Sequence, residues 1–307
     1  MQMVKPRRSA LYMPGANVRA LEKARNLDAD VLLLDLEDAV APEVKAEART
    51  NVVTAVRQRF YGQREVVVRV NGLTTPWGRD DMLAAAAASP DAILLPKVSS
   101  HDDVYKAAAI LREAGAPQSL RLWAMIETPL ALLRLEGLAA LHRDPLSRLD
   151  VFVLGTNDLA RETGARFVPG RAPMAGWLSM AVAAARAYGV DILDGVYNDL
   201  ADKPGFAEEC VQGRDFGMDG KTLIHPDQID VCNKIFSPDE ADVALARRTV
   251  DAFDLPENNG KGAIRLDGRM VELLHADMAR RTLALVDAIA AKVQSRIAAS
   301  QDEGSAT

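Results

Sequence analysis

Short apolar runs rich in valine, isoleucine and leucine alternate with longer alanine-rich segments along most of this sequence. Such runs are typical of buried strands, and the segments between them are long enough for helices that join one parallel strand to the next. The runs, eight in all, are Ala10–Met13, Val31–Leu36, Glu65–Val70, Ala92–Leu95, Leu120–Ile126, Asp150–Leu154, Val190–Val196 and Thr222–Ile224. This alternation indicates an α/β protein.

Eight strand and helix units predict a (β/α)8 barrel, the TIM-barrel fold. The helical segments include Val18–Leu27, Pro42–Phe60, Asp102–Ala114, Leu130–Leu141, Met174–Tyr188 and Phe206–Phe216. A doubly wound sheet with a second domain has the same local pattern and is the alternative. The barrel is favoured because no Gly-x-Gly-x-x-Gly turn follows the first run.

The alternation of apolar runs and helical segments stops after Phe236. We therefore expect a barrel over residues 1–236 and a C-terminal helical extension, acting as a lid, over residues 237–307. Ser237-Pro238-Asp239-Glu240 resembles a helix start, and that helix is expected to end near Phe253 with no strand after it. A second amphipathic helix is expected from Met270 to Ile297. The polar residues 300–307 are expected to be frayed and flexible.

The composition limits which classes of binding partner this chain is expected to have. The chain has 37 Lys and Arg against 43 Asp and Glu, a net charge of -6, which argues against binding nucleic acid or an anionic membrane through bulk charge. Its two cysteines cannot form a disulfide framework and indicate reduced thiols. The apolar stretch near the N-terminus is too short for a signal peptide or a membrane span, so a cytoplasmic location is expected.

Polar side chains stand where five of the predicted strands end. The active site of a (β/α)8 barrel lies at the carboxyl ends of its strands, so these residues are the first candidates for function. They are Asp35, Glu37 and Asp38; Arg69 and Asn71; Lys97; Glu127; and Asn157 and Asp158. A single acid at such a place often only caps a helix or forms a rim ion pair. The whole group, of mixed charge, favours a site for a bound anion.

Glu127 and Asp158 follow consecutive strands and would be neighbours at the mouth of the barrel. Two carboxylates with several waters suit the octahedral coordination of Mg²⁺, for which Mn²⁺ is an expected substitute. The four histidines are scattered, so a zinc site is not expected.

Four basic residues are candidates for binding an anionic substrate. Arg69 can grip a carboxylate through two parallel hydrogen bonds, which a lysine cannot do with the same geometry. Lys97 is a second candidate, with a solvated or barrel-bottom ion pair as an even alternative. Arg19 and Lys23 follow Pro14-Gly15 on a short helix whose N-terminus could hold a phosphate, although a solvated helix face is the commoner explanation.

A set of motifs resembles the HpcH/HpaI aldolase and citrate lyase beta-subunit family, in the same order and over nearly the whole chain. The motifs are RSALYMPGA, LLLDLEDAV followed by Lys45 and Ala48-Arg49, VVRVNG, LLPKV, AMIET, LGTNDLA and GKTLIHPDQI. The C-terminal GAIRLDGRMVE resembles the lid segment of the malyl-CoA, methylmalyl-CoA and citramalyl-CoA lyase branch.

The resemblance implies a (β/α)8 barrel that binds Mg²⁺ and a CoA thioester. It implies roles for residues at matching positions: Glu127 and Asp158 as metal ligands; Asp35, Glu37 and Asp38 around metal-bound waters; and Arg69 on the keto-acid carbonyl. We also expect Asp38 to be catalytic, Lys97, Gly155 and Thr156 to contact the substrate, and Arg19 and Lys23 to contact CoA. In the family the C-terminal segment covers the active site of an adjacent subunit and supplies an acid. Here the aligned residue is Glu272, where the family carries Asp, and Asp267 is the alternative.

The reaction implied is a carbon–carbon lyase step. A 3-hydroxy-dicarboxylic acyl-CoA such as malyl-CoA, beta-methylmalyl-CoA or citramalyl-CoA would split into acetyl-CoA or propionyl-CoA and glyoxylate or pyruvate. Three alternatives remain: a malyl-CoA thioesterase, a citrate lyase beta subunit acting on an acyl carrier protein, and a non-catalytic binding protein. The resemblance also implies a homotrimer or homohexamer with exchanged lids.

Overall fold

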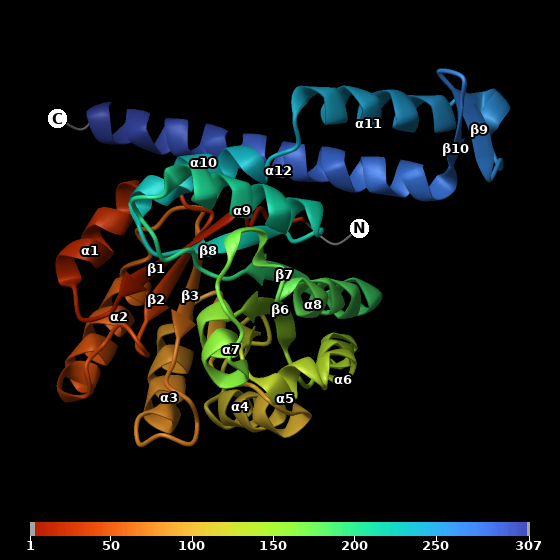
Figure 1. Cartoon of the computed structure of the whole chain (residues 1–307). Helices are drawn as coiled ribbons and strands as arrows, with labels where there is room; N and C mark the ends of the chain where they lie inside the picture. The colour runs from red at the N-terminus through yellow and green to blue at the C-terminus, as the bar shows by residue number, and fades with distance from the viewer. Residues whose placement is uncertain (1–3, 306–307) are drawn as a thin grey trace. The chain divides into compact units, whose positions relative to one another are not determined.

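A computed structural model of the protein describes residues 4–305, with side chains as far as Ser295. Eight parallel strands form a closed barrel in chain order, each paired with the next and β8 paired with β1 (Figure 1), which confirms the predicted TIM barrel. Each predicted run overlaps one strand, although the bounds differ by up to two residues. The strands are β1 Ser9–Pro14, β2 Val31–Asp35, β3 Glu65–Arg69, β4 Ala92–Leu95, β5 Arg121–Ile126, β6 Leu149–Leu154, β7 Asp191–Asp194 and β8 Gly220–Leu223.

Helices follow the strands and cover the outside of the barrel (Figure 1). They are α1 Val18–Lys23, α2 Lys45–Gln58, α3 Gly78–Ala88, α4 His101–Glu113, α5 Pro129–Leu132, α6 Leu135–Ala140, α7 Thr156–Thr163, α8 Ala175–Tyr188, α9 Lys203–Asp215 and α10 Ile229–Ile235. The late IHPDQ motif forms the turn that starts α10: the backbone N–H groups of Ile224 and His225 both donate to Gln228 Oε1. This motif is therefore accounted for by local structure.

The strands are apolar on both faces because each face meets a different part of the core. Successive side chains point to opposite sides of a strand, so Val31 and Leu33 fill the barrel interior while Leu32 and Leu34 pack under the helices. The same alternation turns Asp35 inward at the end of β2. In the register of β2 and β3, Asp35 lies opposite Arg69.

The amino-terminal end of the barrel is closed by a buried arginine. Arg7 donates hydrogen bonds to Glu65 at 2.7 and 2.9 Å, to Asp150 at 2.7 Å and to Asp191 at 2.7 Å. Its guanidinium carbon lies 5.1 Å from the ring centroid of Trp123, inside the barrel. Three carboxylates from β3, β6 and β7 thus share one guanidinium, and this end of the barrel is held together by charge.

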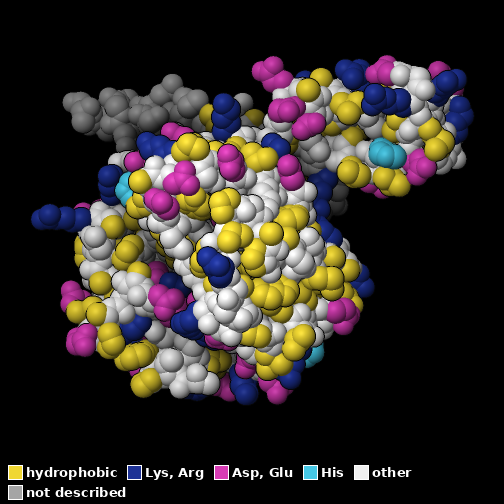
Figure 2. Space-filling model, viewed as in Figure 1, with side chains coloured by type: hydrophobic (Ala, Val, Ile, Leu, Met, Phe, Trp, Pro, Cys, Tyr) yellow, Lys and Arg dark blue, Asp and Glu magenta, His cyan; other side chains and the backbone are white. Residues whose placement is uncertain are grey.

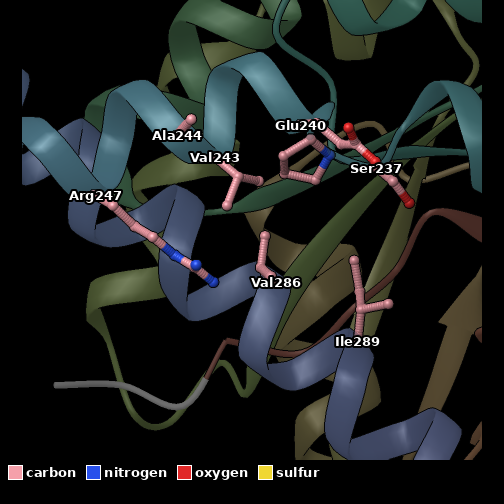
Figure 3. A pocket seen from close by; sticks show the side chains of 8 residues that line it. Ser237, Glu240, Val243, Ala244, Arg247, Val286 and Ile289 are labelled. Carbon is pink, nitrogen blue, oxygen red and sulfur yellow. The ribbon is translucent and has the colours of Figure 1, made fainter.

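Residues Arg7–Phe236 form one compact unit, and the described residues on either side of it form a second. In the second unit α11 Glu240–Phe253 and α12 Leu273–Ser305 run antiparallel (Figure 1). A groove of about 370 Å³ lies between them, where Val243 of α11 faces Val286 and Ile289 of α12 and the Arg247 side chain lies at one side (Figure 3).

The prediction that no strand follows α11 is wrong. Two short antiparallel strands, β9 Ala263–Leu266 and β10 Arg269–Glu272, lie between the helices. Asp267 and Gly268 both have positive φ, which a two-residue hairpin turn of this twist requires. The final helix consequently begins at Leu273 rather than Met270. The helix continues to Ser305, past the predicted end at Ile297. Of the tail over residues 300–307 that was expected to be frayed, residues 306–307 lie outside the described part.

Charged side chains of both signs lie on the surface, and the two cysteines are not joined by a disulfide bond. Over the described residues on the face shown in Figure 2, acidic and basic side chains are interspersed. Cys210 and Cys232 are both buried, free thiols. Within residues 4–305, no helix combines the length and the apolar character needed to cross a bilayer.

Candidate active site

An arginine and an aspartate form the first half of the site at the carboxyl end of the barrel. Arg69 Nε and Nη2 donate to the two oxygens of Asp35, each at 2.7 Å, in a parallel fork. Arg69 Nη1 lies 2.9 Å from Glu37 and 3.6 Å from Asp38. The expected group of three acids is therefore assembled around Arg69. Asp35 also accepts the backbone N–H groups of Glu37 and Ala39, so its oxygens are already engaged.

The loop that carries Glu37 and Asp38 is fixed by the rest of its own motif. Lys45 Nζ, buried at the start of α2, donates to the carbonyl oxygens of Leu36 at 2.8 Å and Glu37 at 2.7 Å. One turn later Arg49 donates to Asp81 at 2.6 Å. The lysine that follows DLEDAV thus holds the acidic loop in place, and the arginine joins α2 to α3.

Tyr12 belongs to the site and was not among the predicted residues. It lies on the inward face of β1, and the guanidinium carbon of Arg69 is 4.6 Å from the centroid of its ring. Burial raises the pKa of Tyr12 against the opposing effect of Arg69, so the phenol stays protonated. The signal in the sequence was the alternation along β1, which places Ala10 and Tyr12 on one face.

Lys97, Glu127 and Asp158 form the second half of the site, as the strand-end pattern predicted. Lys97 follows β4, and its ammonium lies 2.5 Å from Asp158 Oδ1 and 3.6 Å from Glu127 Oε1. The backbone N–H of Lys97 donates to Glu127 Oε1 at 2.6 Å. Arg161, on the next turn of α7, lies 2.7 Å from the same oxygen of Asp158. The other oxygen of Glu127 is buried without a hydrogen bond.

Gly155 and Thr156 form the start of α7 behind this pair of acids. A Cβ at Gly155 would lie 2.4 Å from Glu127 Cβ and 2.6 Å from Glu127 Oε2, so only glycine lets Glu127 occupy its position. Thr156 is buried, and it also lines a hollow of about 600 Å³ between the loops that follow β6 and β7, with Phe167 and Tyr197 among the other lining residues.

Two of the acids hold protons at higher pH than usual. Burial raises the pKa of Glu127 to about 7, although Lys97 lowers it. Burial likewise raises the pKa of Glu37 to about 8, against the effect of Arg69. A buried carboxylate that is not fully compensated favours its neutral form. Any cation that enters the site will favour the charged form of these acids.

The chemistry of Glu127 and Asp158 suits a hard divalent cation. Glu127 follows β5 and Asp158 lies in the first turn of α7, after the neighbouring strand β6, and Glu127 Oε2 is a buried acceptor with no donor. Oxygen ligands of this kind are those that Mg²⁺ takes, usually with only one or two protein carboxylates and the rest from water or substrate. Among the described residues, no group of three or more His, Cys, Asp and Glu is arranged to hold a metal. Water or substrate would therefore supply the remaining ligands.

The remaining predicted residues are on α1 and in the second unit. Arg19 and Lys23 are exposed on α1, whose first turn is capped by Asn17. Glu272 ends β10 in the second unit, and its backbone N–H donates to His275 Nδ1 at 3.0 Å. Asp267, in the hairpin turn of the same unit, is exposed and lies 3.6 Å from Arg248.

A buried ionic network lies behind the 600 Å³ hollow and was not predicted. Lys221 of β8 is fully buried and donates to Asp194 at 2.9 Å and to Glu209 at 2.6 Å. Arg171 donates to Asp194 at 2.7 Å. The lysine of the GKTLIHP motif therefore ties β7, β8 and α9 together.

The paired carboxylates, the arginine and the lysine lie at the carboxyl end of the barrel, which is where TIM-barrel enzymes carry their active sites. The family model for HpcH/HpaI aldolase/citrate lyase matches residues 8–226. The chain belongs to this family.

Two curated relatives differ in the reaction that their names give. A (3S)-malyl-CoA thioesterase of Cereibacter sphaeroides (strain KD131) is 49% identical over 286 residues, which cover 93% of this chain and 96% of the relative. An L-malyl-CoA/beta-methylmalyl-CoA lyase of Cereibacter sphaeroides (strain ATCC 17029) is 34% identical over 293 residues, which cover 88% of this chain and 91% of the relative. Both names describe enzymes that act on CoA esters.

A solved structure supports the same fold. The protein CitE of Mycobacterium tuberculosis, in complex with magnesium, acetoacetate and coenzyme A, superposes with a TM-score of 0.69 at 29% identity. The match covers 89% of this chain and 97% of that one.

Proposed function

We propose that this protein is a Mg²⁺-dependent enzyme that cleaves a 3-hydroxy-dicarboxylic acyl-CoA of the malyl-CoA type, and that thioester hydrolysis is its reaction. The observation that carries the proposal is the pairing of Glu127 and Asp158 beside the Asp35–Arg69 fork at one end of the barrel. The 49% identity to a malyl-CoA thioesterase over nearly both full lengths favours hydrolysis over carbon–carbon cleavage.

The residues of the chain have distinct tasks in this proposal. Glu127 and Asp158 would hold Mg²⁺, which when bound polarises oxygens of the substrate and makes a bound hydroxyl or water more acidic. Arg69, oriented by Asp35, would bind the free carboxylate of the acyl group through its guanidinium. Lys97 would supply a further positive charge beside it. We place the CoA phosphates near Arg19 and Lys23.

Hydrolysis then forms one bond and breaks one bond. The oxygen of a water molecule attacks the thioester carbonyl, the water proton passes to a base, and the C–S bond breaks with the electron pair going to sulfur. The thiolate of CoA takes a proton and leaves with the free hydroxy acid as the other product. Glu272 and Asp38 are the acids that we propose for these proton transfers, because a general acid or base must be a titratable group at the reacting atoms.

Carbon–carbon cleavage is the second candidate, favoured by the relative named as a malyl-CoA lyase and by the inward-facing Arg69, which fits a keto-acid product. Here a base removes the hydroxyl proton and the bond between the α and β carbons breaks. An α-keto acid and the enolate of the shorter acyl-CoA result, and an acid protonates the enolate. The barrel residues keep the same tasks.

One assay separates the two reactions. The full chain is incubated with Mg²⁺ and (3S)-malyl-CoA, beta-methylmalyl-CoA or citramalyl-CoA, and free thiol and α-keto acid are read separately, with and without EDTA. Free thiol without keto acid, abolished by EDTA, is the expected result. Keto acid without free thiol would make the protein a lyase. Turnover that EDTA leaves unchanged would contradict the metal assignment.

We further propose a homotrimer or homohexamer in which the second unit brings Glu272 to the barrel of a neighbouring subunit. Glu272 stands directly before α12, where the positive end of the helix favours a carboxylate. A mixture of Glu127→Gln and Glu272→Ala subunits is expected to regain activity that neither variant has alone. Two inactive variants that stay inactive when mixed and refolded together would contradict the exchange.

A further inference from the structure

Lys97 contacts both proposed metal ligands, and it does so through two different groups. Its backbone N–H donates to Glu127 Oε1 at 2.6 Å, while its ammonium lies 2.5 Å from Asp158 Oδ1. The same ammonium is 3.6 Å from Glu127 Oε1. One positive charge therefore bridges the two carboxylates where a divalent cation would bind.

The backbone holds this arrangement in an unusual conformation. Lys97 has φ of +54°, the left-handed region that side-chain-bearing residues rarely adopt. This turn, directly after Pro96 and the end of β4, aims the N–H of Lys97 at Glu127. Strained conformations of this kind persist where the surrounding contacts demand them, and they concentrate at functional sites.

Two cations already lie against the pair of acids before any metal is present. Glu127 and Asp158 face two cations, the ammonium of Lys97 and the guanidinium of Arg161, which is 2.7 Å from Asp158 Oδ1. A divalent cation held by these acids would share them with the Lys97 ammonium, which already lies 2.5 Å from Asp158 Oδ1, and like charges at one pair of carboxylates repel. The side chain of Lys97 is 36% exposed, so it has room to move toward the solvent of the barrel mouth.

The geometry points to Lys97 as a positioning residue that holds Glu127 and Asp158 together before the metal binds and is displaced by the metal. This inference rests on the metal site of the proposed function. The displaced ammonium remains tethered next to the metal, so it is available to a carboxylate of the substrate. Metal and anionic substrate are then expected to strengthen each other's binding, with Lys97 as part of the coupling.

The first test measures binding of Mn²⁺ alone to the full chain by electron paramagnetic resonance of the free ion. Lys97→Met removes the competing charge and is expected to bind Mn²⁺ about tenfold more tightly than the wild type. Lys97→Arg keeps the charge and is expected to remain within about twofold of the wild type. Lys106→Met, at an exposed position of α4, is the matched control and should leave Mn²⁺ affinity unchanged.

The second test follows the ammonium itself. Acetylation of Lys97 by an amine-reactive ester, read by peptide mass spectrometry, is expected to speed up several-fold when Mg²⁺ saturates the site. Lys106 is expected to react at the same rate with and without Mg²⁺. An unchanged rate at Lys97 would overturn the displacement, because simple repulsion between Lys97 and a metal that leaves it in place predicts no such change.

The third test measures the coupling by titrating Mn²⁺ with and without pyruvate. Pyruvate should tighten Mn²⁺ binding in the wild type by a larger factor than in Lys97→Met. Equal factors would exclude Lys97 from the coupling. If neither the wild type nor Lys97→Met binds Mn²⁺, the metal site of the proposed function fails; if both bind with equal affinity and Lys97 reactivity is constant, only the displacement fails.

Discussion

An arginine among carboxylates lies at each end of the barrel, and the two clusters differ in how completely their charges are paired. At the amino-terminal end Arg7 bonds to Glu65, Asp150 and Asp191. At the carboxyl end Arg69 bonds to Asp35 and lies beside Glu37. Among the described side chains, two buried oxygens lack a hydrogen bond, and both are at the carboxyl end: Glu37 Oε2, which keeps an ion pair of 2.9 Å with Arg69, and Glu127 Oε2.

This difference predicts that the cluster around Arg7 serves stability and the cluster around Arg69 serves function. A TIM barrel carries its chemistry at the carboxyl end, and the opposite end mainly holds the strands together. A buried oxygen without a donor, such as Glu127 Oε2, costs free energy, and its presence at the carboxyl end is consistent with a ligand that uses it. We therefore expect changes at Arg7 to affect folding and changes at the carboxyl end to affect turnover.

Arg7→Met should produce the largest effect. Three carboxylates would lose their common cation, and breaking a buried ionic cluster in this way costs about 3–5 kcal/mol. Urea denaturation followed by circular dichroism measures the loss. Arg7→Lys, which keeps a charge but not the guanidinium, should lose less. If folded Arg7→Lys protein has a much lower kcat than the wild type, the separation of the two ends is wrong.

Glu127→Gln should reduce Mg²⁺-dependent turnover by about 10²–10³-fold, because a neutral amide neither holds the cation nor balances its charge. The midpoint of urea denaturation should stay close to that of the wild type, since the side chain keeps its shape. Asp158→Asn serves as the partner variant. Full activity of either variant would remove it from the metal site.

Arg69→Lys should raise KM for the acyl-CoA about tenfold, or roughly 1.4 kcal/mol, because a single ammonium cannot keep the forked contact with Asp35 and also reach a substrate carboxylate. Steady-state kinetics with saturating Mg²⁺ checks this value. A KM equal to that of the wild type would show that Arg69 does not bind the substrate carboxylate.

The smallest effect is expected from Asp191→Asn, read as the pH dependence of stability. Burial, followed by repulsion from Asp219, raises the pKa of Asp191 to about 6, above its ordinary value of 3.8. The folded state therefore binds this proton more tightly than the unfolded state, and the stabilisation is lost as pH rises from about 4 to 6.

Relative to Asp191→Asn, the wild type should lose on the order of 1 kcal/mol of stability over that pH range. The Asp191 side chain is 29% exposed, so solvent screens its interactions and the loss is partial. Denaturation of both proteins at pH 4, 5, 6 and 7 measures the difference between them. A difference that is constant with pH would show that Asp191 titrates as it does in the unfolded chain.

The barrel was predictable because its strands are apolar on both faces and short enough to stand out as runs. The hairpin of β9 and β10 was missed, although Asp267-Gly268 is a strong signal for a two-residue turn. The flanking residues explain the omission. Ala263–Leu266 and Arg269–Glu272 are short and mostly exposed or half-buried, so they lack the apolar character by which the other strands were found.

The site was predictable as a set of residues but not as a set of contacts. Strand ends placed Arg69, Lys97 and Glu127 at one end of the barrel, because parallel strands all end there. Sequence position does not report which acid takes which cation, since that depends on side-chain conformation. Thus the fork between Asp35 and Arg69, and the bridge made by Lys97, came only from the structure.

The close approach of Gly155 to Glu127 limits how this chain can evolve. Every substitution at position 155 adds a Cβ that collides with Glu127, so no mutational path that keeps the acid in place passes through that position. Acceptance of a longer or bulkier acyl group must arise elsewhere, in loops such as those around Phe167 and Tyr197 that border the neighbouring hollow. Variant libraries aimed at new substrates should therefore leave position 155 fixed and randomise these loops.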